Sequence, residues 1–206
     1  MKHLTSRELY DYWNRVRRDR PAPRRNEIEP GDIRRILADT FILEAAGRDR
    51  FPIRLAGTRM CGMYCREIKG GNFLDLWTAS DRNAIATLAT AVAADAAAAV
   101  ITLEGRNARG KAVACEVLLL PLLHAGPDYD RILGSCAPLE RPYWLGTEPV
   151  VRQTLVSLRL LWPNEQPSFM RRTSDRGTTT AAPVIPFPLP DRRRRGHLTV
   201  YDGGKR

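Results

Sequence analysis

Three strand-like runs joined by short connections lie in the centre of the chain, and they constrain its fold more than any other feature. Residues 100–106 lead through a turn at 107–110 into residues 112–123, and a third run covers residues 131–139. Apolar residues alternate along the middle run, as is typical of a β-strand, at Val113, Cys115, Val117 and Leu119. Parallel strands need long crossover connections, so connections this short favour antiparallel pairing.

Two further strand-like runs come earlier and are separated from these three by helical sequence. Residues 41–45 and 51–58 are joined by a short turn and predict a hairpin. Residues 59–77 predict short helical turns and loops, and residues 82–97 predict a long helix. The order indicates an α+β fold in which helices pack on one face of a five-stranded antiparallel sheet.

An amphipathic helix is predicted near the N-terminus. Thr5 and Glu8 have the spacing of a capping box, and Pro21 ends the helix near Arg20. A second, shorter helix is expected over residues 31–37, after Pro30. The apolar stripe of the first helix needs a cover, either the outer face of the sheet or a second copy of the chain. The candidate dimer or partner face therefore consists of Leu9, Trp13 and Val16.

The composition changes towards the C-terminus. Residues 151–162 carry Leu155, Leu158 and Leu161 at helical spacing and predict a short amphipathic helix. From Pro163 the chain is rich in Pro, Arg, Ser and Thr and predicts an irregular, basic tail, in which residues 197–204 are either a docking segment or a late strand. The predicted organisation is an N-terminal helix and linker, one domain, and a short helix with its tail, over residues 1–25, 26–145 and 146–206.

The positive charge of the chain lies at its two ends. Residues 1–25 hold eight basic and three acidic residues, residues 171–206 hold nine and three, and residues 26–170 hold sixteen and seventeen. A neutral body argues against a nucleic-acid-binding fold, whose basic face belongs to the folded domain. The tails, with an arginine run at 192–195, are then either solubilising or a weak contact for nucleic acid, anionic lipid or an acidic protein.

The location of the protein is predicted from two missing patterns. The sequence has no run of about 18 apolar residues, which a membrane-spanning helix requires. Its first residues also lack the apolar core of a signal peptide. We therefore expect a cytoplasmic protein whose four cysteines are reduced thiols.

The order of two strands, a helical middle and three strands resembles that of a PAS domain. Particular residues strengthen the likeness to a PAS family of small stand-alone alphaproteobacterial proteins, formerly a domain of unknown function. The match covers residues 5–145 well, and its most specific part is the run Arg54-Leu55-Ala56-Gly57-Thr58. The other residues that carry it are Tyr12-Trp13, Pro23, Glu29-Pro30-Gly31-Asp32-Ile33, Leu37, Phe41-Ile42-Leu43, Phe51, Gly70, Leu74-Asp75-Leu76 and the ending Asp202-Gly203-Gly204.

This resemblance implies a bacterial sensory or interaction module. A sheet with a helical flap over one face leaves a space that is filled by side chains or holds a small ligand. The candidates that line this space are Arg54, Thr58 and Tyr64. Arg54 either holds an anionic ligand through its guanidinium or points out of the sheet and pairs with Glu44 or Glu116; strand alternation favours the second arrangement.

The cysteines and histidines give little sign of a cofactor. Cys61 and Cys65 are one helical turn apart and are candidates for a redox pair, which requires an exposed thiol with a lowered pKa. No Cys-x-x-Cys pair occurs, so we expect no metal site. The segment around Cys61 does not match the flavin-binding motif of photosensing PAS domains. No histidine falls on the central helices, where haem-binding PAS domains carry their ligand. We therefore expect no cofactor beyond an unidentified small ligand.

No catalytic motif accompanies these features: neither a Ser/His/Asp grouping nor a phosphate-binding glycine loop occurs. The leading hypothesis is a non-enzymatic regulatory protein in signal transduction, which acts through a protein partner and forms a homodimer through its N-terminal helix. The alternatives are an adaptor that binds nucleic acid or an anionic surface through basic tails, and a thiol redox sensor.

Overall fold

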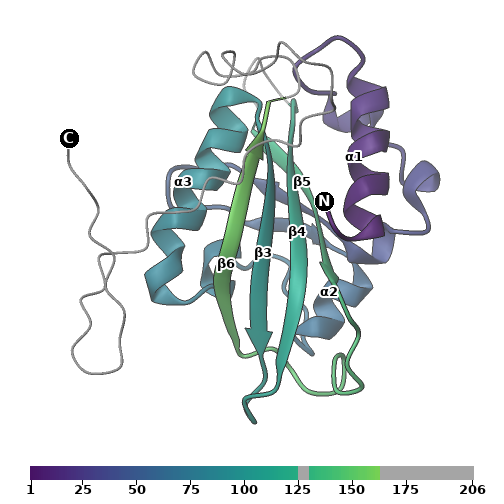
Figure 1. Cartoon of the computed structure of the whole chain (residues 1–206). Coiled ribbons are helices and arrows are strands. Elements are labelled where there is room, and N and C mark those ends of the chain that lie inside the picture. The colour runs from purple at the N-terminus through teal and green to yellow at the C-terminus, as the bar shows by residue number, and fades with distance from the viewer. Residues whose placement is uncertain (125–129, 163–206) are drawn as a thin grey trace, which may run out of the picture.

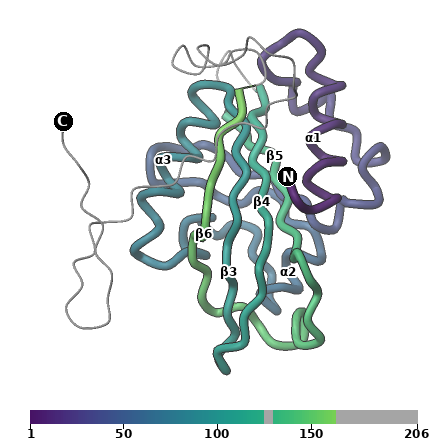
Figure 2. The backbone as a smooth tube through the Cα atoms, in the orientation of Figure 1, coloured from purple at the N-terminus to yellow at the C-terminus, as the bar shows by residue number. Residues whose placement is uncertain are grey.

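A six-stranded antiparallel sheet forms the centre of the protein (Figure 1). It is seen in a computed structural model that describes residues 1–124 and 130–162. The strand order is β2-β1-β5-β4-β3-β6, and Figure 2 shows β6, β3, β4 and β5 side by side. The strands are β1 (Thr40–Glu44), β2 (Ile53–Ala56), β3 (Ala98–Arg106), β4 (Ala112–Leu122), β5 (Arg131–Pro138) and β6 (Arg152–Leu161). The antiparallel sheet predicted from the short connections is confirmed, with one strand more than expected.

Helices cover both faces of this sheet rather than one. The inner face carries α2 (Thr58–Met63), the 3-10 turn η4 (Phe73–Leu76) and α3 (Ala79–Asp95). The outer face carries α1 (Leu4–Arg17) with the 3-10 turns η1 (Arg25–Glu27) and η2 (Pro30–Ile33). The short helix predicted over residues 31–37 is found only as two 3-10 turns, because η2 ends at Ile33 and a further turn, η3 (Leu37–Asp39), leads into β1. None of the helices in the described ranges is both long enough and apolar enough to cross a bilayer.

The apolar stripe of α1 lies against the outer face of the sheet. Leu9 and Trp13 are completely buried there, and Val16 packs at the edge of the same cluster. The indole Nε1 of Trp13 donates a hydrogen bond of 2.9 Å to the carbonyl of Pro121 on β4. Of the two covers predicted for this stripe, the sheet is therefore the one found, and a dimer face built on Leu9 and Trp13 is incompatible with their burial.

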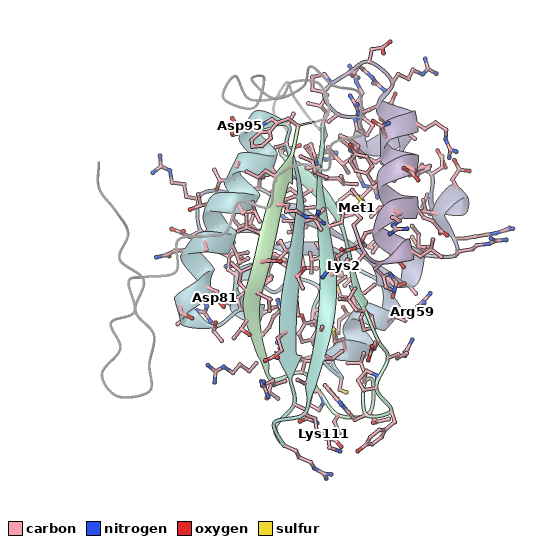
Figure 3. All side chains as sticks on the ribbon, viewed as in Figure 1. Met1, Lys2, Arg59, Asp81, Asp95 and Lys111 are labelled. Atoms are coloured by element: carbon pink, nitrogen blue, oxygen red, sulfur yellow. The ribbon has the colours of Figure 1, made fainter. Side chains whose placement is uncertain are left out.

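The start of α1 is held by a buried carboxylate on β4. Glu116 is 1% exposed, and its two oxygens accept hydrogen bonds from the amides of Lys2 (2.7 Å) and His3 (3.0 Å). Figure 3 shows Met1 and Lys2 lying over the strands. The N-cap is His3, whose Nδ1 accepts from the amide of Thr5 at 3.1 Å, so the predicted capping box at Thr5 is wrong.

The predicted helix at residues 151–162 is also wrong, since these residues form β6 along the edge of β3. A β-bulge explains why the apolar residues of this strand have the spacing of a helix. Leu155 pairs with Leu103 and Ser157 pairs with Thr102, so Val156 is an extra residue that shifts the alternation. Leu155 and Leu158 consequently both contact the inner core although they are three residues apart, which is a helical spacing.

The start of β6 is bound to α3 as well as to β3. The backbone amide of Leu155 donates to the Asp81 carboxylate at 2.8 Å, and the amide of Thr78 donates to the carbonyl of Gln153 at 3.0 Å. Figure 3 shows Asp81 at the end of α3 beside this strand. The tail predicted from Pro163 onward, with the arginine run at 192–195 and the ending at 202–204, lies outside the described residues.

We predict that Gly134→Ala destabilises the protein by about 1–3 kcal/mol, because extra atoms in a packed core force their neighbours to move. A Cβ at this position on β5 would lie 2.2 Å from the ring of Phe41 and 2.8 Å from the carbonyl oxygen of Leu118. Gly62→Ala is the matched control, since a Cβ there meets nothing within 4 Å and alanine favours the helix. Urea unfolding of both variants measures the difference; equal stabilities would contradict this packing.

We predict that Glu116 makes stability depend on pH. Burial pushes its pKa upward, but the hydrogen bonds from the Lys2 and His3 amides outweigh burial and leave the pKa below its usual 4.5. The stabilisation is therefore fully present above pH 4.5 and is lost as the pH falls through the lower, folded-state pKa. Glu116→Gln should cost about 1–3 kcal/mol near neutral pH. Unfolding titrations should show this difference shrinking in acid; a constant difference would contradict the assignment.

Candidate ligand pocket beside α2

A close backbone contact sets the position of α2. Gly57 follows β2, and a Cβ there would lie 2.3 Å from the carbonyl oxygen of Ala38 and 2.5 Å from that of Leu37. Only glycine allows the chain to pass η3 so closely before α2 begins at Thr58. This contact gives a physical reason for the glycine in the Arg54–Thr58 run.

A pocket of about 240 Å³ lies between α2, β5 and the segment that connects β5 to β6. Thr58, Arg59 and Met63 line it from α2, Cys136 lines it from β5, and Arg141 lines it from the connecting segment. Asp39, at the end of η3, adds a carboxylate to the same wall. The pocket thus combines apolar and sulfur-containing side chains with three charged groups.

The charged groups of the pocket are arranged around Asp39. This residue is 4% exposed, and its Oδ2 lies 3.3 Å from Nη1 of Arg59. Burial raises the pKa of Asp39, while the positive charges of Arg59 and Arg141 oppose the rise. Arg141 is exposed and has no hydrogen-bond or ion-pair partner among the described residues, so its guanidinium is free to meet a ligand.

Two hydrogen bonds connect α2 and the residue after it to the β6 segment. Tyr64 directly follows α2, and its hydroxyl donates to Oε1 of Gln153 on β6 at 2.6 Å. Both side chains are buried, and burial raises the pKa of Tyr64 well above 10, which keeps the hydroxyl protonated. The amide of Val150 donates to the carbonyl of Met63 at 2.9 Å. These two bonds join the end of α2 to Gln153 on β6 and to Val150, just before that strand.

The three ligand candidates from the sequence do not come together. Thr58 lines the pocket, and Tyr64 is buried behind α2. Arg54 points outward with 56% of its side chain exposed and pairs with Glu44, which is one of the partners expected for the outward orientation. Its hydrogen bond to Glu44 is the main reason why the pKa of that carboxyl is lowered.

The two redox candidates lie at the surface end of α2. Cys65 is exposed and Cys61 is partly exposed, and the Cys61 thiol donates to Glu67 at 3.4 Å. Burial raises the pKa of Cys61, and the Glu67 carboxylate adds to the rise. A reactive sensor thiol needs the opposite shift, since the thiolate is the nucleophile. The geometry therefore gives no support to redox sensing at Cys61.

The polar residues that sequence reasoning missed are Asp39, Arg59 and Arg141, which line the pocket, and Gln153, which accepts the hydrogen bond of Tyr64. They belong to four separate segments, and each is an ordinary polar residue in its local sequence. The signal available in the sequence was indirect: Arg59 directly follows the candidate Thr58 in the same short helix, and Tyr64 comes directly after that helix. Their convergence depends on the path of the chain between β5 and β6, which no local pattern specifies.

These features define a small α+β domain whose antiparallel sheet carries helices on its inner face and a small pocket beside α2, lined by both apolar and charged residues. The family described as PAS domain matches residues 1–137. The chain belongs to the PAS domain family, whose members are typically sensory or regulatory rather than catalytic. The match ends before β6, so this strand and the segment preceding it lie outside the matched region.

Solved structures with a similar fold include a variant of RsLOV, at 20% identity and a TM-score of 0.42. That match covers 53% of this chain and 64% of the RsLOV chain, so the protein spans just under two thirds of it. The Rhodobacter sphaeroides LOV protein is 19% identical, with a TM-score of 0.39 and coverages of 56% and 71%. The PAS domain of an HTR-like protein from Haloarcula marismortui is 18% identical, with a TM-score of 0.35 and coverages of 48% and 78%. No curated protein matches the chain.

We predict that Tyr64→Phe costs about 1–3 kcal/mol, because it leaves a buried amide oxygen of Gln153 without its donor. The double variant Tyr64→Phe/Gln153→Leu removes both polar partners and should recover much of that loss. Tyr143→Phe is the control, since Tyr143 is 81% exposed. Denaturant unfolding of the wild type, the single variants Tyr64→Phe and Gln153→Leu and the double variant gives the coupling energy; additive effects would show that the hydrogen bond contributes nothing.

Proposed function

We propose that this PAS protein is a non-enzymatic sensory regulator that binds a small molecule in the α2 pocket and passes its occupancy to a protein partner through β6. The observation that carries the proposal is the pair of hydrogen bonds joining the α2 region to the β6 segment, Tyr64 to Gln153 and Val150 to Met63. A ligand that moves α2 must either move the start of β6 or break these bonds. Signalling of this kind needs a ligand that binds one arrangement better than the other.

Exposed apolar groups support a role for β6 in partner binding. Val151 and Val156 are 61% and 62% exposed, and Val156 is the extra residue of the bulge. Bulges redirect side chains at sheet edges, where new strands or proteins pair. The protein partner expected from the sequence therefore has an apolar contact on the strand that receives the signal. A second copy of the chain is one such partner.

The test starts from protein purified from its own host, which is compared before and after removal of any bound molecule. Native mass spectrometry detects a retained mass, and hydrogen exchange then compares the loaded and stripped forms. We expect loading to change amide protection in α2 and in residues 152–161 together. The double variant Tyr64→Phe/Gln153→Leu removes one of the two links and should weaken the change in residues 152–161 relative to that in α2. If loading changes no amide protection in β6, in either the wild type or the double variant, the proposed path is refuted.

A further inference from the structure

Three sulfur-containing side chains from separate elements lie in the inner core beside the α2 pocket. Cys115 Sγ on β4 lies 3.9 Å from Sδ of Met63 on α2. Cys136 on β5 faces the same core, interacts with Cys115 and is its diagonal neighbour, since Cys136 pairs with Val117. All three residues are buried, while Met63 and Cys136 also line the pocket. This sulfur cluster of Met63, Cys115 and Cys136 was not anticipated from the sequence.

The spacing suits a metal ion with three ligands in one plane. Sulfur ligands lie about 2.3 Å from a bound metal, so two of them at 120° are about 4.0 Å apart. Cys115 Sγ and Met63 Sδ are 3.9 Å apart in the structure. These two sulfurs therefore have the separation that a shared trigonal ion requires, and Cys136, the diagonal neighbour of Cys115 on β5, is the third ligand that we infer.

The donor set selects the class of metal. Thiolate and thioether sulfurs are soft ligands that favour Cu(I), whereas harder divalent ions need nitrogen or oxygen donors. Among residues 1–124 and 130–162, no group of three His, Cys, Asp or Glu side chains is placed to hold a metal. We propose that Met63, Cys115 and Cys136 form a binding site for one monovalent copper ion.

Binding is balanced in charge and has an entry path. Two Cu–S bonds form as the two thiols lose their protons to solvent, Met63 donates a lone pair, and copper keeps its oxidation state. The product carries a charge of −1, and Arg59 and Arg141 line the pocket that leads to it.

The site also has a connection to the signalling path. Its thioether belongs to Met63, whose carbonyl accepts from the amide of Val150. Coordination would fix the end of α2 and, with it, the segment that leads into β6. The binding site rests on the sulfur geometry alone, whereas its role as the sensed ligand rests on the proposed function.

The test is an anaerobic titration of the full chain with Cu(I) against a chromophoric chelator. We expect one ion per chain, an ultraviolet thiolate-to-copper band, and only sulfur neighbours in X-ray absorption. Met63→Leu should weaken copper binding about tenfold or more. Cys115→Ser or Cys136→Ser should each weaken it by more than roughly 100-fold, which is the largest loss typical of a residue that only supports a metal ligand. The control is Cys61→Ser/Cys65→Ser, which removes both surface thiols and should bind as wild type.

Each result of this titration is decisive. No binding by the folded wild type, or a loss of binding in the Cys61/Cys65 control, would overturn the site. Thermal unfolding checks that each cluster variant is folded, and Met63→Leu, which nearly conserves volume, serves if a cysteine variant is not. Hydrogen exchange with copper then separates the two proposals: tight binding without a response in residues 152–161 keeps the site and refutes its role in signalling.

Discussion

The central strand β4 is buried on both of its faces, and the rest of the structure depends on this constraint. Val117 and Leu119 point into the inner core, while Leu118, Leu120 and Leu122 point to the outer side. An antiparallel sheet normally leaves one face to solvent, so two apolar faces require two covers. Helices α3 and α2 cover the inner face, and α1 covers the outer face. Hydrogen bonds hold α1 in place, from Trp13 to β4 and from the amide of His3 to Glu116.

The pocket lies beside α2, the shorter of the two α-helices that cover the inner face of the sheet. α2 has only six residues, and Gly57 brings its start against η3, which places Asp39 beside Arg59. The segment between β5 and β6 closes the pocket with Arg141 and then returns to pair with β3. The same segment therefore builds one wall of the pocket and begins the strand that would carry its signal. Under the proposed function, the ligand site and β6 are therefore in direct contact, and no chain of intermediate residues is needed to connect them.

The sulfur cluster follows from the same geometry. Strand alternation turns Cys115 and Cys136 to the inner face, and the end of α2 brings Met63 above them. Buried cysteines usually behave as small apolar residues. Here, however, Cys136 lines a pocket together with the thioether of Met63, and Cys115 lies beside them in the core. The surface pair at Cys61 and Cys65 has the more conspicuous sequence spacing, yet it lies apart from this cluster.

The sequence by itself determined the antiparallel sheet, the hairpin of β1 and β2, the long helix α3 and the apolar stripe of α1, because each depends on local periodicity or on short turns. Gly57, which allows α2 to begin close to η3, also stood in the Arg54–Thr58 run that the sequence analysis singled out. Tertiary structure alone decided the sixth strand, since a bulge at Val156 gives β6 the spacing of a helix. It also decided the pocket and the sulfur cluster, because their residues are distant in sequence and converge only when the sheet is assembled.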